Sequence, residues 1–127
     1  MTFQIKRVYD PAATTDGIRV LIDRLWPRGV RKSAAQLALW MKDVAPSPRL
    51  RQWFGHEPER FAEFGRRYRV ELRGNPQLEQ LRALGKAKRV TLLYGARDPE
   101  VNHAAVLQRV LSARGSRPKA KAARKKT

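Results

Sequence analysis

The chain has 127 residues, of which 42% are hydrophobic, and this length and apolar content suit one domain with a core of its own. It carries 28 Lys and Arg against 11 Asp and Glu, a net charge of +17, and it contains no cysteine. Disulfides, thiolate metal sites and a cysteine nucleophile are therefore excluded. The N-terminal segment lacks the apolar core of a secretory signal and no apolar run reaches the length of a membrane span, so we expect a cytoplasmic protein with no membrane partner.

Three segments have the apolar patterns of strands. Residues 3–9 alternate between apolar and polar, whereas residues 18–26 and 89–95 are nearly continuous apolar runs, which are typical of strands covered on both faces. Residues 10–17 are too few for the helical crossover that joins most parallel neighbours. The first strand is therefore expected to be antiparallel to the second, or not adjacent to it.

Three helix starts are marked by a capping residue followed by proline, at Ser47-Pro48, Asn75-Pro76 and Asp98-Pro99. The capping residue takes the extended backbone that a following proline enforces, and proline in the first helical position loses no hydrogen bond. These pairs predict helices over 48–54, 76–84 and 99–113.

Two further helices are predicted from apolar spacing. One covers residues 58–73, and the other begins at Ser33 as its cap and runs to residue 44, with Leu37, Trp40, Met41 and Val44 on one face. Together these patterns predict an α/β fold over residues 1–113: a small, mostly parallel sheet flanked by about five helices in a single domain.

Charged residues follow the second predicted strand, in the stretch "DRLWPRG". If the second and third strands are parallel neighbours, the loops after both lie beyond strand carboxyl ends, where open α/β sheets bind their ligands. Arg24 and Arg28 are candidates for clamping an anion there, because a guanidinium offers a planar fork to carboxylate or phosphate oxygens. Asp23 is a candidate base, or it orients an arginine; the alternative is a structural ion pair between Asp23 and Arg24.

The loop after the third strand, "YGARDPEVNH", contributes further candidates. Asp98 is first of all the expected cap of the last helix, whose N-terminus is a second anion-binding element facing the same crevice. His103 is a candidate general acid or base, with Tyr94 and Asn102 as hydrogen-bonding neighbours; the alternative is a packed histidine.

Two basic residues near "APS", Lys42 and Arg51, are candidates to add to the positive field of the crevice; a solvated helix face explains them equally well. The two histidines have no supporting acidic motif, and the glycines match neither a Walker loop nor a dinucleotide fingerprint. We therefore expect no metal site and no cofactor.

Three stretches carry a family resemblance: "RVLIDRLWPRGVRK", "VTLLYGARDPEVNHAAVL" and, between them, the pattern W.K..APS..LR.WF.H. Over residues 3–111 the chain resembles the short bacterial branch of the DUF488 family, an uncharacterised group. Longer members are similar to α/β proteins in which one strand ends in Asp-x-Arg and a later strand in a cysteine-containing segment. The resemblance places Tyr94 where that cysteine would stand, and Asn102-His103 where a second Cys-His pair would stand. It implies a fold and a pocket but names no reaction.

The C-terminal segment 114–127 holds seven basic residues, no acidic residue and no large apolar residue, so it carries +7 of the charge and residues 1–113 carry +10. A segment with nothing to bury is predicted to be disordered. It is either a site of non-specific contact with nucleic-acid phosphates or a solubilising extension.

Three functions fit these observations. The first is a domain that binds or acts on a small anionic metabolite at the strand carboxyl ends. The second is a nucleic-acid-associated protein that uses its basic body and tail, and the third is a non-catalytic partner-binding module. We favour the first; the sequence decides neither whether the chain is an enzyme nor its oligomeric state.

Overall fold

The computed structural model of the chain describes residues 3–114. Its centre is a sheet of four parallel strands, ordered β1-β4-β2-β3. The strands are β1 (Phe3–Arg7), β2 (Ile18–Leu21), β3 (Leu39–Trp40) and β4 (Val90–Tyr94). The predicted α/β fold with a small parallel sheet is confirmed.

The position of β1 decides between the two arrangements expected for the first strand. It pairs with β4 and is parallel to it, and β4 separates it from β2. The non-adjacent arrangement is therefore correct and the antiparallel one is wrong. The segment that connects β1 to β2 contains no α-helix, only a 3-10 turn at Thr14–Asp16.

Within residues 3–114 five α-helices accompany the sheet: α1 (Lys32–Ala35), α2 (Pro48–Phe54), α3 (Phe61–Leu72), α4 (Pro76–Ala87) and α5 (His103–Arg114). Two of the predicted caps form. The Ser47 hydroxyl accepts the Leu50 N–H at 3.2 Å, and the Asn75 side chain accepts the Gln77 N–H at 2.9 Å. Proline occupies the first position of both helices, α2 and α4, as predicted.

The last helix begins four residues later than expected. The Asp98 carboxylate accepts the N–H groups of Glu100 and Val101 at 2.8 and 3.0 Å, which closes a turn and starts no helix. The cap of α5 is Asn102, whose side-chain oxygen accepts the Ala105 N–H at 2.8 Å. The prediction that Asp98 caps this helix was wrong, because Asn102 is a second strong capping residue and wins the competition.

The predicted helix over residues 33–44 is also wrong. Only residues 33–35, in α1, are α-helical; Gln36 then takes a left-handed conformation with φ 47°, the chain continues as β3, and Lys42–Val44 form a 3-10 turn. The face expected from helical spacing is divided between the two sides of the sheet. Leu37 and Trp40 pack with a small cluster on one side, while Met41 and Val44 join the main core on the other. Pairing with β2 outweighs the helical pattern here.

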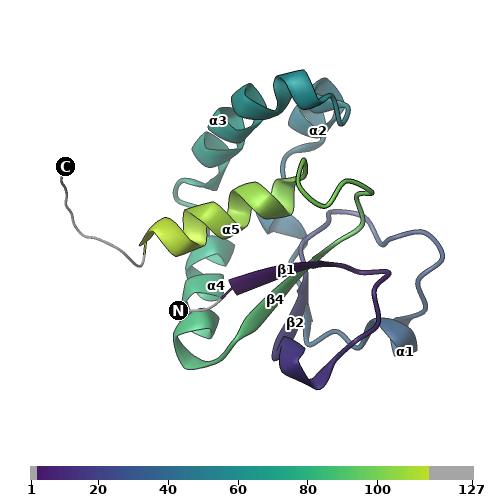
Figure 1. Ribbon diagram of the computed structural model, residues 1–127. Coiled ribbons are helices and arrows are strands. Elements are labelled where there is room, and N and C mark those ends of the chain that lie inside the picture. Colours follow the sequence, from purple (N-terminus) through teal and green to yellow (C-terminus); the bar gives the residue numbers. More distant parts are fainter. Residues whose placement is uncertain (1–2, 115–127) are drawn as a thin grey trace.

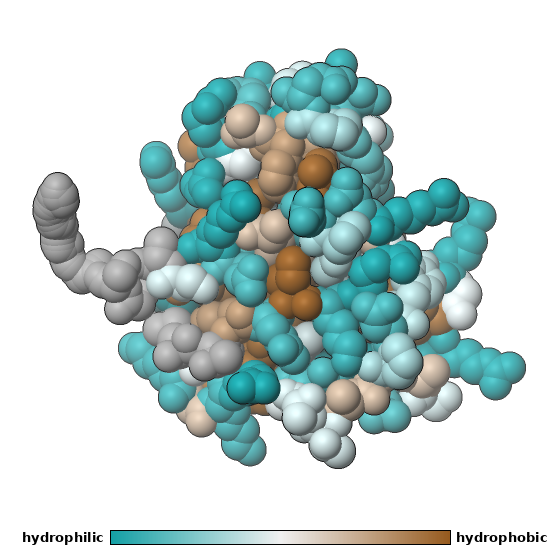
Figure 2. Space-filling model, viewed as in Figure 1, coloured by the Kyte–Doolittle hydropathy of each residue, from teal (hydrophilic) through white to brown (hydrophobic). Residues whose placement is uncertain are grey.

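The short helix α1 lies on one face of the sheet, where its Ala35 carbonyl accepts Arg19 Nε–H at 3.0 Å, and helices α2 to α5 cover the other face (Figure 1). The main core lies there, where β-strand side chains such as Val20 and Leu92 meet α3, α4 and α5. On the opposite face Val8, Leu21 and Leu93 form a smaller cluster, covered by loop residues that include Trp26 and Val30. The outer surface seen in Figure 2 is mostly hydrophilic. No helix in residues 3–114 has both the length and the apolar character needed to cross a membrane.

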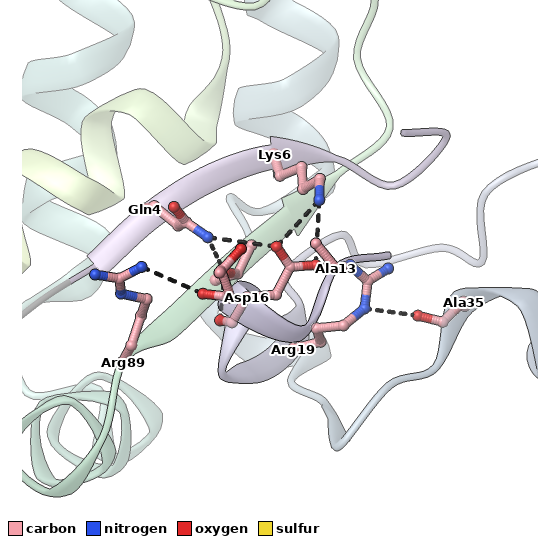
Figure 3. A network of polar contacts seen from close by, with 9 residues as sticks. Gln4, Lys6, Ala13, Asp16, Arg19, Ala35 and Arg89 are labelled. Atoms are coloured by element: carbon pink, nitrogen blue, oxygen red, sulfur yellow. Dashed lines mark hydrogen bonds and ion pairs between the residues drawn. The ribbon is translucent and has the colours of Figure 1, made fainter. Parts of the chain in front are cut away.

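A buried polar network joins three strands on the loop-covered face (Figure 3). The Asp16 side chain, 2% exposed, accepts the Ala13 N–H at 3.0 Å and pairs with Lys6 of β1 and Arg19 of β2. The Thr91 hydroxyl of β4 donates to the Asp16 carbonyl at 2.6 Å. The network fixes the turn before β2 against the sheet.

Candidate functional site

A cavity of about 280 Å³ lies beyond the carboxyl ends of β1, β2 and β4. The loops after these strands form one wall, and the N-terminus of α5 and the α2 region form the other. Such a volume is close to the lower end of the range for small-molecule sites, and the position is the one where open α/β sheets bind ligands.

Six of the nine predicted site residues line this cavity: Asp23, Arg24, Arg28, Arg51, Asn102 and His103. The other three do not. Tyr94 is 2% exposed and points into the main core, and its burial raises its pKa. The Lys42 ammonium lies 4.3 Å from the centre of the Trp40 ring, and Asp98 is exposed in its turn.

Asp23 lies against β4 and α5. Its Oδ2 accepts the Gly95 N–H at 2.9 Å, and a Cβ at residue 95 would lie 2.9 Å from this oxygen, so any larger residue there would force the carboxylate to shift. Its Oδ1 lies 3.2 Å from His103 Nε2. The alternative of an Asp23–Arg24 ion pair is therefore not what the structure shows, because the Arg24 guanidinium lies against Asp43.

The tautomer of His103 follows from its surroundings. Its Nε2 faces two oxygens, the Ile22 carbonyl at 3.0 Å and Asp23 Oδ1 at 3.2 Å. A lone pair at Nε2 would be repelled by both, so Nε2 carries the proton and donates. The hydrogen bond goes to the Ile22 carbonyl, and Asp23 Oδ1, although it lies 3.2 Å away, makes no hydrogen bond with any of residues 3–114.

Arg24 is held by the segment before α2. Its Nη2 and Nε donate to the carbonyls of Ala45 and Pro46 at 3.2 and 3.4 Å, and Nη1 lies 3.5 Å from Asp43 Oδ1. This arginine therefore connects the loop after β2 to the helical layer. Its charge is fixed beside the cavity at 30% exposure of the side chain.

The guanidinium groups of Arg28 and Arg51, unlike that of Arg24, are not held by neighbouring residues. Both are exposed, and neither guanidinium makes a hydrogen bond or ion pair with any of residues 3–114. Arg28 comes from the loop after β2 and Arg51 from α2, yet both line the same cavity. Both guanidinium groups are free to bind an incoming carboxylate or phosphate.

The cavity wall is basic. Three arginines and one aspartate line it, which leaves +2 with both histidines neutral. Trp26, Phe54 and Phe64 supply apolar wall, and such low-dielectric surroundings strengthen the field of the charges. Among residues 3–114 no three His, Asp or Glu side chains are grouped so that they could hold a metal ion.

Sequence reasoning missed three contributors. Tyr9 lines the cavity and donates its hydroxyl to the Arg28 carbonyl at 2.9 Å, which ties the loop after β1 to the loop after β2. Phe54 and His56 reach the cavity from the end of α2, where Gly55 and His56 both take left-handed backbone. The pattern "WFGH" signals the helix stop but not the direction in which its side chains point.

Comparison with known proteins gives one family and several relatives. The model of the family described as the inactive DUF488-N3 subclade matches residues 2–126. The chain is 45% identical over 111 residues to the uncharacterised protein Rv3073c of Mycobacterium tuberculosis, covering 87% of this chain and 94% of the relative. It is 44% identical over 108 residues to the uncharacterised protein YeaO of Escherichia coli, covering 84% and 94%. No solved structure matches the chain.

Proposed function

The chain belongs to the inactive DUF488-N3 subclade, and from this we propose that it binds a small oxyanion in the cavity beyond the strand ends without converting it. The description of the subclade as inactive supports binding over catalysis. The absence of any cysteine supports it too, since the chain has no thiol to act as a nucleophile.

The convergence of three arginines carries the proposal. Arg24 and Arg28 follow β2 and Arg51 belongs to α2, so the fold brings together like charges from separate segments. Like charges repel, and the two carboxylates near them, Asp23 in the wall and Asp43 beside Arg24, leave a charge of +1 unbalanced. A bound anion would supply the missing charge.

The three arginines would play different parts. Arg28 and Arg51, which have free guanidinium groups, would contact the anion directly. Arg24, which donates to two backbone carbonyls, would act as a fixed positive charge at the edge of the site. Asn102 uses its side chain to cap α5 and to donate to the Asp98 carbonyl, so its part would be to hold His103 in place.

Titration calorimetry with inorganic phosphate and sulfate at constant ionic strength tests this proposal. Arg28→Gln and Arg51→Gln should each weaken binding about tenfold, because each removes a charge-assisted hydrogen bond. The matched control is Arg73→Gln, which removes the same charge from an exposed residue outside the cavity and should leave the affinity unchanged.

Two results would overturn the proposal. One is a parent protein that binds neither anion. The other is an equal loss of affinity in all three variants, which would mean that the net charge of the molecule attracts anions without a defined site.

A further inference from the structure

The cavity has an exposed apolar wall that the binding of a simple oxyanion does not use. Within residues 3–114 four large apolar side chains are exposed, and two of them line this cavity: Leu25 at 63% and Tyr9 at 45%. Tyr9 comes from the loop after β1 and Leu25 from the loop after β2. The fold therefore brings exposed apolar surface from two separate loops to the same place as the arginines.

The residues on both sides of Leu25 are held in place. Arg24 donates to two backbone carbonyls of the segment before α2, and Trp26 Nε1 donates to the Val30 carbonyl at 2.8 Å. Because its neighbours are held, Leu25 stays outside the core with its apolar surface in water. Covering that surface with an apolar group is favourable.

The Tyr9 ring is held beside one of the arginines proposed to bind the anion. Its hydroxyl donates to the Arg28 carbonyl at 2.9 Å, and the Arg7 guanidinium lies 4.9 Å from the centre of its ring. The ring remains 45% exposed in this position. An apolar group joined to an oxyanion on Arg28 would therefore have aromatic surface within reach.

From this arrangement we propose that the ligand is an organic oxyanion, a phosphate or carboxylate joined to an apolar body about the size of a benzene ring. The oxyanion would lie on Arg28 and Arg51, and the apolar body would cover Leu25 and the ring of Tyr9. The cavity volume of about 280 Å³ suits a whole small molecule better than an inorganic ion. This inference rests on the proposed function, because it needs the anion to bind in the same cavity.

Two phosphate monoesters, phenyl phosphate and methyl phosphate, test the inference on the full chain. At a pH at which both are dianions they present the same charged group and differ only in the apolar body. Each carbon that is buried raises affinity roughly fourfold, so calorimetry should give phenyl phosphate an affinity at least about tenfold above that of methyl phosphate. The heat-capacity change of binding should also be more negative for phenyl phosphate, because it marks the burial of apolar surface.

Leu25→Ala is the matching variant. The side chain is mostly exposed, so its truncation should leave the fold intact. It should lower the affinity for phenyl phosphate more than that for methyl phosphate, so that their ratio falls about threefold or more. Val70→Ala is the control, because it truncates an apolar side chain that is 58% exposed on α3 and lies outside the cavity. It should keep the ratio of the parent protein.

The outcomes separate this inference from the proposed function. Equal affinity of the parent protein for both esters overturns the inference and leaves anion binding intact; this comparison needs no variant. The same ratio in Leu25→Ala and Val70→Ala also overturns it, because Leu25 then does not meet the apolar body. Unchanged affinity for phenyl phosphate in a variant with both Arg28→Gln and Arg51→Gln overturns it too, since the ester then binds on another apolar surface. If neither ester binds, the proposed function fails and the inference fails with it.

Discussion

Asp16 anchors the turn between β1 and β2 by holding Lys6 and Arg19 against the loop-covered face of the sheet. We predict that Asp16→Asn lowers the free energy of unfolding at pH 7 by about 3 kcal/mol, because it leaves a buried arginine without its counter-charge. Urea unfolding followed by circular dichroism measures the change. Asp43→Asn is the control: its exposed pair with Arg24 should contribute less than about 1 kcal/mol.

The pH dependence of the same residue has a definite sign. Burial alone would raise the pKa of Asp16, but the Ala13 N–H and the side chains of Lys6 and Arg19 outweigh it, so the pKa lies below its usual 3.8. The stabilisation is therefore complete above about pH 4 and is lost as the pH falls through the lowered pKa. Equal acid sensitivity of the parent protein and Asp16→Asn would contradict this account.

At the scale of the element, α4 packs on β1 through Gly85. A Cβ at this position would lie 2.2 Å from Cζ of Phe3. Helix propensity alone predicts that Gly85→Ala gains about 0.5–1 kcal/mol, whereas forcing atoms into a packed core costs about 1–3 kcal/mol. We predict a net loss of stability in thermal and urea unfolding.

The exposed Ala83 of the same helix gives the matched control. Ala83→Gly should lose about 0.5–1 kcal/mol from propensity alone. Both substitutions should therefore destabilise the protein, although they exchange the same two residues in opposite directions. A stabilised Gly85→Ala protein would show that the Phe3 ring moves aside at little cost.

The elements that the sequence predicts correctly depend on local signals. Ser47 and Asn75 cap their helices through bonds to residues two or three positions away. The start of α5 and the existence of β3 were not predicted, because in each case two structures compete for the same residues. Asn102 displaces Asp98 as the cap, and β3 exists because β2 offers an edge for pairing, which no local pattern reveals.

The residues of the candidate site also divide into those that the sequence predicts and those that depend on the tertiary structure. The rule that ligands bind beyond strand carboxyl ends groups Asp23 and Arg28 with His103, and all three line the cavity. Tyr94 does not, because alternate residues of β4 face the helices and its position in the strand directs it into the core. Tyr9 could not be predicted, since the place of β1 in the sheet was open from the sequence.

At the scale of the whole molecule, the basic C-terminal segment lies outside the described residues, apart from Arg114 at the end of α5. We predict that deleting residues 115–127 leaves the melting temperature nearly unchanged, because the segment has no large apolar side chain to bury. A fall of several degrees on deletion would show that the segment packs on the domain.

The same deletion tests the nucleic-acid alternative. Six basic residues are removed, so binding of duplex DNA through this segment should have a log-log salt slope of about −5 and should be abolished by the deletion. Filter binding or fluorescence anisotropy over a range of salt concentrations measures it. Sequence-selective binding by the shortened chain would instead favour the second function, a nucleic-acid-associated protein whose folded domain recognises DNA.

A crystal structure of the full chain grown with phosphate tests the anion-binding site most directly. We predict a phosphate in the cavity beyond β1, β2 and β4, with oxygens about 2.7–2.9 Å from the guanidinium nitrogens of Arg28 or Arg51. The backbone should move little on binding, because the sheet and α5 already hold most of the wall. Phosphate bound only elsewhere on the basic surface, with the cavity arginines directed away into solvent, would contradict the account.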